Sequence, residues 1–479
     1  MRNEMKRREF VQLTLAGSAL CLAGSGVWAF AGSPNGPKLV SPGCRKTKVK
    51  VARLYLGDPQ LRAWPKPDLN LEDEVRFYGS EFAKLKQELS DVEFVVDELV
   101  TTADQVGPLK ARLKDVDGIL AIHLRMGIGA ILREILSVGQ PTMVFAVPYS
   151  GHEWSGFGAL QKQELGAKLG CMLTSDYRQL AAAVRPFRAI HHLREAKILN
   201  VTSRTSTGND AVQKKFGTQV KEIGLKQVLD ACNAVDDQQA KAEAEQWIQG
   251  AVAVVEPPPE AVLKSCKLAL ALEKLLDEEE ATVITVDCYG TMYRPLCQGY
   301  AFPCLGFTRL NDMGLGGMCE SDLESAMTHI LFQGLSGRPG YISDPTVDES
   351  RNSIILAHCL GTRKMDGPDG PAAPYKLRTI MERQEGVVPQ VKMRVGEKVT
   401  QARLVGADLL PYFVGQIVEV PDVDRGCRTK ITVKVEGSVE KLWKNWSYGL
   451  HRVTCYGDIT KELEHFCRFK TVEMKNEAV

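Results

Sequence analysis

Four residues in the second half of the chain have side chains suited to metal binding or acid–base chemistry. Two are carboxylates, Glu320 and Asp344, and two belong to the eight histidines of the chain, His358 and His451. Carboxylate oxygens and imidazole nitrogens together suit a hard or borderline divalent ion, and Mn²⁺ is the natural choice for a carboxylate-rich set. Each of the four residues also has a more ordinary structural role open to it.

Glu320 lies near the start of a predicted helix. The segment Gly316–Leu323 is expected to open a helix that runs to about Leu331. In that helix Glu320 falls on the apolar face, whereas Asp322 points nearly the opposite way. Glu320 is therefore expected to face inward, either as a functional acid or as an end cap that accepts backbone N–H groups. The pattern alone leaves both roles open.

Asp344, His358 and His451 have local explanations as well. Asp344 directly precedes Pro345, and an acid at that position is typical of a turn. His358 ends the apolar run Ile354–His358, where a lone histidine is more often a core residue than a ligand. His451 falls in the C-terminal part of the chain, which is predicted to be rich in strands. Spacing alone does not establish that the four residues converge.

Several common cofactor sites are excluded by missing motifs. Gly127 and Gly129 lack the third glycine of a G-x-G-x-x-G dinucleotide fingerprint, and the glycines at 314–318 have the wrong spacing. The chain has no G-x-x-x-x-G-K-[ST] phosphate loop and no G-x-S-x-G nucleophile elbow. A dinucleotide enzyme, a P-loop enzyme and a serine hydrolase of that type are therefore disfavoured.

The elements that would position these residues alternate between strand and helix patterns. Strands are predicted at Lys48–Tyr55, Gly118–His123 and Pro141–Val147, separated by helices at Glu72–Leu89 and Gly127–Val138. This β-α-β order predicts a parallel sheet that is covered by helices.

A second unit of the same kind follows. Strands are predicted at Ile198–Val201 and Ala281–Asp287, and helices at Asp210–Gly224, Leu225–Asn233 and Glu260–Asp277. Beyond this unit, apolar and polar residues alternate between Gly and Pro breaks, which is typical of antiparallel strands.

The length of 479 residues predicts about three domains. We expect an N-terminal αβ domain at 47–186, a second αβ domain carrying the catalytic acids at 187–345, and a β-rich, barrel-like domain at 346–479 that ends with a helix at Thr460–Phe469. The predicted fold class is α/β, with two doubly wound αβ domains followed by an antiparallel β-rich domain.

Residues 1–32 have the pattern of a twin-arginine signal peptide. Arg7 and Arg8 precede a moderately apolar run that ends in the small-residue exit Ala29-Phe30-Ala31. The alternative is a membrane anchor, but the run is marginal in length and rich in Gly and Ser. We expect export to the periplasm or another extracytoplasmic compartment, a linker at 33–46, and no stable membrane insertion once the signal is removed.

The net charge and the spacing of the cysteines exclude further classes of function. Sixty Lys+Arg against 59 Asp+Glu leave a net charge of +1, which argues against a nucleic-acid partner bound through bulk charge. The 13 cysteines include no C-x-x-C pair, and Cys288, Cys297 and Cys304 are too widely spaced for a usual zinc knuckle. Buried cysteines acting as small apolar residues are the default expectation.

Four segments of the C-terminal half resemble the L-fucose and L-arabinose isomerase-like family. They are DCYGTM at 287–292, FPCLGFTRLNDMGLGGMCESD at 302–322, SDPTVDESRNSIILAHC at 343–359 and GLHRVTCYGD at 449–458. The resemblance covers about the last 200 residues. The N-terminal half matches the family only in its αβ rhythm.

The resemblance implies a metal-dependent sugar isomerase. It implies two αβ domains and a β-rich domain, assembly as a trimer or hexamer, and interconversion of an aldose and a ketose with Mn²⁺ or another divalent metal. The metal ligands would be Glu320, Asp344, His358 and His451. The metal would hold O1 and O2 of a monosaccharide while a proton moves between C1 and C2 through an ene-diol, with Glu320 as base and Asp344 as its partner.

Two other functions stay open at this point. An exported, non-catalytic sugar-binding protein of the same fold would also suit two αβ domains with a cleft. An exported sugar oxidoreductase is the third possibility, and the missing dinucleotide fingerprint counts against it.

Overall fold

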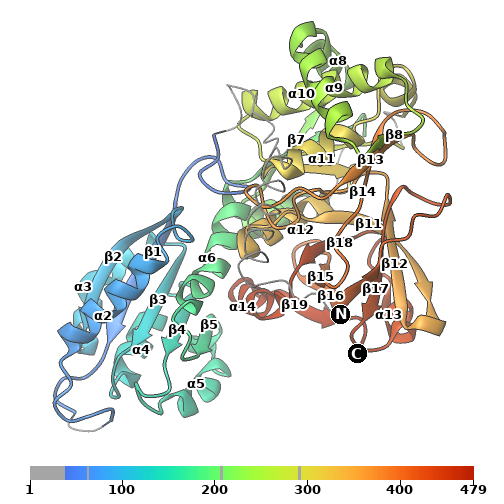
Figure 1. The fold of residues 1–479 in the computed structure, drawn as a ribbon. Helices are drawn as coiled ribbons and strands as arrows, with labels where there is room; N and C mark the ends of the chain where they lie inside the picture. The colour runs from blue at the N-terminus through green and yellow to red at the C-terminus, as the bar shows by residue number, and fades with distance from the viewer. Residues whose placement is uncertain (1–37, 62–63, 205–208, 290–292) are drawn as a thin grey trace, which may run out of the picture. The chain divides into compact units, whose positions relative to one another are not determined.

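The computed structural model describes residues 38–61, 64–204, 209–289 and 293–479. Two parallel α/β sheets come first along the chain, and a six-strand antiparallel β-barrel follows them (Figure 1). This confirms the predicted fold class. The predicted signal peptide, residues 1–32, lies outside the described residues.

The first sheet has five parallel strands. In order across the sheet they are β2 (Val92–Val100), β1 (Val49–Leu56), β3 (Gly118–His123), β4 (Thr142–Ala146) and β5 (Leu169–Leu173). The strands β3 and β4 are buried along their whole length, as expected of a sheet covered on both faces.

Helices cover both faces of this sheet. One apolar cluster joins the strands to α3 (Val106–Lys114), α4 (Gly129–Leu136) and α5 (Trp154–Gln161). A second cluster joins them to α2 (Leu71–Lys84) and α6 (Gln179–Glu195). The unit is therefore doubly wound, as predicted.

The second sheet has four parallel strands. In order they are β10 (Gly316–Cys319), β9 (Val283–Val286), β6 (Lys197–Val201) and β7 (Gln219–Ile223). The predicted helix at Asp210–Gly224 is wrong in its second half, because the structure has α7 (Asn209–Phe216) and then the strand β7. The single turn at 217–218 between them is too short for the helix pattern to reveal the change.

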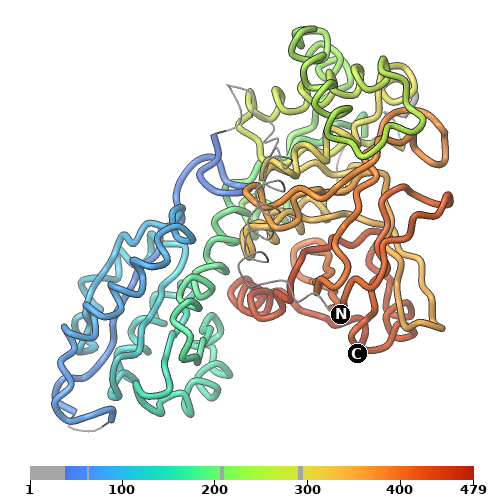
Figure 2. The backbone as a smooth tube through the Cα atoms, in the orientation of Figure 1, coloured from blue at the N-terminus to red at the C-terminus, as the bar shows by residue number. Residues whose placement is uncertain are grey.

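Helices pack around this sheet in one large apolar cluster. They are α8 (Leu225–Asn233), α9 (Asp237–Gly250), α10 (Pro259–Glu278), α11 (Cys304–Asp312) and α12 (Leu323–Ser336). The helix α6 leads from the first sheet into β6 and also packs on α12, so it belongs to both units (Figure 2). A Cβ on Gly334 of α12 would lie only 2.4 Å from Cα of Ala189, which shows how closely the two helices approach.

The barrel is a closed antiparallel sheet. Its strands in order are β15 (Lys398–Ala402), β18 (Arg452–Tyr456), β11 (Tyr341–Asp348), β12 (Ser353–His358), β17 (Thr429–Val435) and β16 (Leu409–Glu419). β15 pairs with β16, and this pairing closes the ring. Closure leaves no free edge between these six strands.

Smaller elements complete the C-terminal region. A three-stranded sheet contains β14 (Val388–Val391), β13 (Tyr375–Arg378) and β8 (Ala253–Val254). The helix α13 (Val439–Asn445) lies between the barrel strands β17 and β18. The helix α14 (Thr460–Lys470) follows β18, and the chain then adds β19 (Glu473–Asn476) to β16 in parallel. The predicted final helix at Thr460–Phe469 is confirmed, but a short strand follows it.

The structure adds two facts about the predicted domain limits. The limit at 345/346 falls inside β11, whose residues all belong to the barrel sheet. Within the predicted linker, Gly43 donates a backbone hydrogen bond of 2.8 Å to Gly314, and Arg45 forms an ion pair of 2.7 Å with Asp277. The described part of that segment is thus tied to the second unit.

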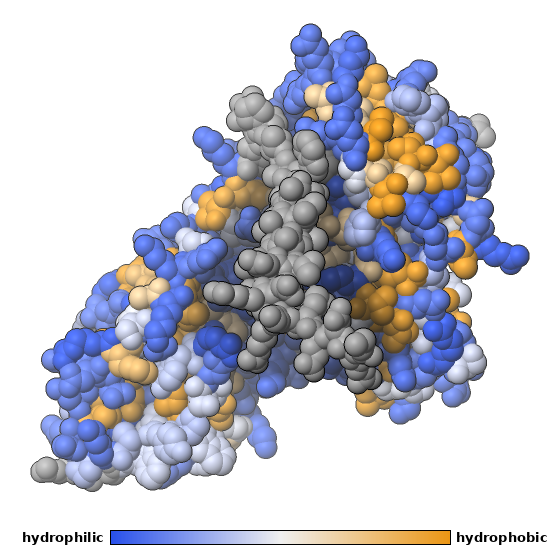
Figure 3. All heavy atoms as spheres, viewed as in Figure 1, coloured by the Kyte–Doolittle hydropathy of each residue, from blue (hydrophilic) through white to orange (hydrophobic). Residues whose placement is uncertain are grey.

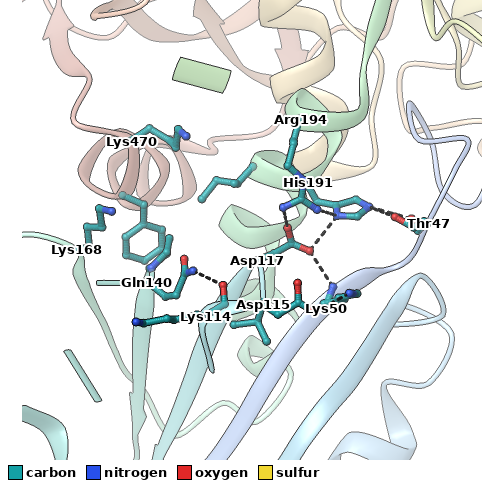
Figure 4. Close-up of a pocket in the computed structure, with 14 residues that line it drawn as sticks. Thr47, Lys50, Lys114, Asp115, Asp117, Gln140, Lys168, His191, Arg194 and Lys470 are labelled. Carbon is teal, nitrogen blue, oxygen red and sulfur yellow. Dashed lines mark hydrogen bonds and ion pairs between the residues drawn. The ribbon is translucent and has the colours of Figure 1, made fainter. Parts of the chain in front are cut away.

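A cavity of about 550 Å³ lies between α6, α14 and the amino ends of β3, β4 and β5 (Figure 4). Asp117 accepts hydrogen bonds in it from the backbone of Lys50 at 2.8 Å and from His191 at 2.9 Å, and it forms an ion pair with Arg194. His191 reaches the carbonyl oxygen of Thr47 at 2.9 Å with its other ring nitrogen. This network ties α6 to the sheet.

The face drawn in Figure 3 is mainly hydrophilic, with apolar side chains gathered in several separate patches. In the part of the chain that the structure describes, no helix is long and apolar enough to cross a bilayer.

Candidate active site

Glu320, Asp344, His358 and His451 converge in the structure. His451 Nε2 lies 3.2 Å from Asp344 Oδ1 and 3.7 Å from Glu320 Oε2. The rings of His358 and His451 have centroids 5.5 Å apart. Ligand-type atoms of Asp344, His358 and His451 lie within 4.8 Å of one another, as do those of Glu320, His358 and Cys319. We call these four residues the candidate site.

Glu320 enters this site from the end of a strand rather than from within a helix. The expected helix opening at Gly316–Leu323 is wrong, because Gly316–Cys319 form β10 and α12 begins at Leu323. Glu320 thus lies beyond the carboxyl end of a parallel strand, the edge at which open α/β sheets place their ligands. Its side chain is 29% exposed, between the core and open solvent.

The turn that carries Glu320 is conformationally unusual. Glu320 and Ser321 have φ values of 62° and 59°, in the left-handed region that residues with a Cβ rarely adopt. The backbone N–H of Ser321 donates to the carbonyl of Val286 at 3.1 Å, and its hydroxyl donates to Asn200. Two consecutive strained residues held by neighbouring strands are typical of functional turns.

Asp344 is part of a strand and not a turn former. It lies in β11, paired with Ala357 of β12, and the same strand pairs Ser343 with Arg452 of β18. Extending this antiparallel register by one residue places His451 opposite Asp344. The barrel pairing therefore brings this acid and this histidine together, although Pro345 suggested a local role.

The two histidines flank β11. His358 is the last residue of β12, and His451 directly precedes β18. Both are buried, with exposures of 2% and 5%. The expectation that His358 ends an apolar strand is confirmed.

Asp322 and Arg403 complete the surroundings of His451, and the sequence reasoning missed both. Asp322 Oδ2 accepts a hydrogen bond from His451 Nδ1 at 2.8 Å and one from Arg403 Nη1 at 2.6 Å. The other Asp322 oxygen caps α12 by accepting from the backbone of Ser325 at 2.9 Å. The expectation that Asp322 points away is wrong because it assumed a helix that had already begun. An acid directly before the apolar run at Leu323 was the available N-cap signal.

Their surroundings shift the pKa values of the two acids, Glu320 and Asp344, in opposite directions. Burial raises the pKa of Glu320; the charge of His451 opposes this, and the negative charges of Asp344 and Asp322 add to it, so that the pKa lies above its usual value. Burial also raises the pKa of Asp344, but contacts with His451 and the field of His358 outweigh it, so that this pKa lies below its usual value. One acid is therefore the better proton carrier and the other stays ionised, a division typical of catalytic carboxylate pairs.

The pKa values of the two histidines are also shifted in opposite directions. Burial lowers the pKa of His451, but contacts with the Asp322 and Asp344 carboxylates outweigh it and raise this pKa to about 10. Burial lowers the pKa of His358 to about 4, because the charge of Asp344 only partly compensates. Without a bound cation, His451 is therefore charged near neutral pH and His358 is neutral.

Two buried nitrogen atoms in the site lack hydrogen-bond partners. They are Nε2 of His358 and Nε2 of His451; the latter approaches Asp344 but makes no well-aligned hydrogen bond. Buried polar atoms in native proteins nearly always have partners, so such atoms need an explanation. The carboxylates of Glu320 and Asp344 beside the unpartnered Nε2 of His451 fit a divalent cation of borderline hardness.

Asp322 orients His451 for such a role. A carboxylate that accepts from Nδ1–H fixes the tautomer with its lone pair on Nε2, the arrangement usual for a metal-binding histidine. His358 is arranged differently, because its Nδ1 accepts a hydrogen bond of 2.8 Å from the backbone N–H of Cys359. The neutral ring of His358 therefore carries its proton on Nε2, facing the site.

The fold and the site define an α/β protein with a barrel and a cluster of acids and histidines able to hold a divalent metal. Among known proteins, the chain is similar to the sulfoquinovose isomerase of Clostridium sp. (strain MSTE9), with 29% identity over 196 residues. The match covers 36% of this chain and 38% of that protein, well under two thirds of the relative. No family model matches the chain. The protein is thus distantly similar, over part of its length, to a sugar isomerase.

Proposed function

We propose that this protein is a divalent-metal-dependent isomerase that interconverts an aldose and a ketose. The convergence of Glu320 and Asp344 with two unpartnered imidazole nitrogens carries this proposal. The partial similarity to a sulfoquinovose isomerase supports it and makes sulfoquinovose the first sugar to test. A homo-oligomer, extracytoplasmic export and Mn²⁺ as the metal are further parts of the proposal.

Glu320, Asp344 and His451 would hold the metal. Asp344 is ionised, and His451 would release its Nε2 proton when the metal binds, because a ligand nitrogen must present a lone pair. When bound, the metal would stabilise the negative charge that develops on the sugar oxygens O1 and O2. His358 was expected as a fourth ligand, but its protonated Nε2 is better suited to donate a hydrogen bond to a sugar oxygen.

The proton steps fall to the chain's own carboxylates. Glu320, whose pKa is raised, would remove the proton from C2 of the aldose and so generate the ene-diol. Glu320, whose partly exposed carboxyl can exchange its proton with solvent, would then deliver a proton to C1 and so complete the ketose. An acid–base partner must move the hydroxyl proton between O1 and O2. Asp344, ionised and within reach of His451, would be that partner.

Ketose formation from a panel of sugars tests this function. The purified protein, loaded with Mn²⁺, should convert at least one of sulfoquinovose and a set of neutral aldoses, and chelator should abolish the conversion. Glu320→Gln should lower turnover by about 10²- to 10⁴-fold, because a positioned acid–base group contributes that much. His465→Gln, which removes a histidine of α14 outside the site, is the matched control and should leave turnover unchanged.

Measurements of Mn²⁺ binding distinguish the proposed roles of the two histidines. His451→Gln should lose Mn²⁺ affinity, whereas His358→Gln should keep it and lose turnover. Sugar affinity that persists in chelator, with no turnover of any sugar, would favour a non-catalytic binding protein instead.

A further inference from the structure

Two thiols and a carboxylate form a second cluster close to the C-terminal end of the strand β12. Cys359 follows His358 at that end, Cys427 precedes β17, and Glu382 lies in the loop after β13. The sulfur atoms of Cys359 and Cys427 are 3.9 Å apart, and the Cys427 sulfur lies 3.5 Å from Glu382 Oε1. All three ligand-type atoms lie within 4.8 Å of one another. We call these residues the thiol cluster.

The spacing of the thiol cluster matches a tetrahedral metal site. With zinc–sulfur bonds of about 2.3 Å, tetrahedral angles place two ligand sulfurs about 3.8 Å apart. A carboxylate oxygen about 2.0 Å from the ion lies about 3.5 Å from such a sulfur. Both separations agree with those in the structure, so an ion could enter without rearrangement of the backbone.

The cluster is closed on one side and open on the other. Cys359 is buried, Cys427 is half-buried and Glu382 is exposed, which gives an ion a route from solvent. On the buried side, the Cys304 side chain of α11 is 3% exposed and belongs to the same apolar cluster as Cys359. Water on the open side would supply the fourth ligand, as it does at zinc sites with three protein ligands.

The ligand chemistry separates this cluster from the candidate site. Thiolates select zinc and similar soft ions, whereas carboxylates with few nitrogens suit manganese or magnesium. This cluster could not be predicted from the sequence, since its cysteines come from segments distant along the chain and form no C-x-x-C pair. Only the pairing of β12 with β17 brings them together.

We propose that Cys359, Cys427 and Glu382 bind one Zn²⁺ ion. The ion ties the loop that carries Glu382 and the loop before β17 to the end of β12, directly beside His358. Each coordinating cysteine releases its thiol proton to solvent when the ion binds. The site does not depend on the proposed isomerase activity, because none of its ligands belongs to the candidate site.

Cadmium titration of the reduced, full-length protein tests this site. Cd²⁺ bound by thiolates gives a charge-transfer band in the ultraviolet, and Zn²⁺ should displace it. We expect one tightly bound Cd²⁺ with this band in the wild type. Cys427→Ser should remove the band and weaken binding by more than the roughly 10- to 100-fold that a change outside the direct ligands costs.

Two control variants make the result decisive. Cys171→Ser removes another half-buried cysteine, in β5, and should keep the band and the affinity. Glu320→Gln should also keep both, because it alters only the candidate site. A wild type without a thiolate band, a Cys427→Ser variant that retains it, or a Glu320→Gln variant that loses it would overturn the proposal. These outcomes are independent of whether any sugar is turned over.

Discussion

The orientation of one imidazole ring links the residues of the candidate site. His451 is held at Nδ1 by Asp322, and this bond leaves Nε2 facing Asp344 and Glu320. Asp322 is fixed in turn by Arg403 and by the amino end of α12. The buried carboxylate of Asp322 therefore caps α12, forms an ion pair with Arg403 and orients His451, a proposed metal ligand.

Removing that carboxylate should impair metal binding without touching the ligands themselves. We predict that Asp322→Ala lowers Mn²⁺ affinity by about 10- to 100-fold, the usual effect of losing a partner that orients a metal-binding histidine. Calorimetric titration with Mn²⁺ measures this effect. Asp322→Asn is the matched control, because its one amide oxygen can still accept from His451, although its NH2 group cannot then cap α12; its Mn²⁺ affinity should lie between those of the wild type and Asp322→Ala. Equal affinity in Asp322→Ala and the wild type would contradict the proposed role of this residue.

The four site residues could be named from the sequence, but their roles and neighbours could not. Asp344 and His451 come together through strand pairing between distant segments, and no local pattern encodes that register. Asp322 was predicted to point away from the site because the strand β10 is only four residues long and is followed by two left-handed residues, which the sequence pattern does not reveal. Short strands of glycine, methionine and cysteine carry no alternation from which the period could be recognised.

At the scale of elements, a buried charge network holds α6, the helix that connects the two parallel sheets, to the first sheet. His191 donates to Asp117 from one ring nitrogen and to the Thr47 carbonyl from the other, so the ring is doubly protonated. Burial lowers the pKa of His191, but the hydrogen bond to Asp117 and contacts with Cys44 and Glu195 outweigh it and raise this pKa to about 12. The charged ring therefore stabilises the folded state.

This network predicts a pH-dependent loss of stability in His191→Gln. A group whose pKa is raised on folding stabilises fully below its unfolded value, here 6.5, and loses that contribution as the pH rises toward about 12. The difference in the free energy of unfolding between wild type and variant should therefore be largest near pH 6 and shrink by about pH 10. Urea unfolding at both values measures it, and a difference that grows with pH would contradict the assignment.

Asp117→Ala serves as the companion variant. It leaves the charges of His191 and Arg194 without their shared partner, and breaking a buried ion pair in this way costs about 3–5 kcal/mol. A cost near zero would show that the network does not hold α6 to the sheet.

The elements themselves were predictable where the apolar pattern was long. The strand at Gly118–His123 and the helix at Leu225–Asn233 match the structure residue for residue. The strand β7 was missed because its sequence, Gln219–Ile223, is largely polar and exposed at the edge of its sheet. Edge strands of this kind show neither the alternation nor the apolar run on which such predictions depend.

For the molecule as a whole, the order of two parallel sheets and a closed barrel follows from the sequence, while the site depends on their assembly. Glu320 comes from the second sheet, whereas Asp344, His358 and His451 come from the barrel. The near-zero net charge agrees with a small-molecule partner rather than a nucleic acid. The proposed export signal at residues 1–32 lies outside the described residues and stays a prediction.

Exchange of the sugar C2 hydrogen with solvent tests the central proposal most directly, since it reports proton abstraction even when little ketose accumulates. In deuterated water, with sulfoquinovose and neutral aldoses followed by nuclear magnetic resonance, we predict Mn²⁺-dependent loss of the C2 hydrogen signal of at least one sugar. Chelator should stop this exchange, and Glu320→Gln should slow it by at least about 10²-fold. Exchange that continues without metal, or that proceeds equally fast in Glu320→Gln, would contradict the proposed isomerase.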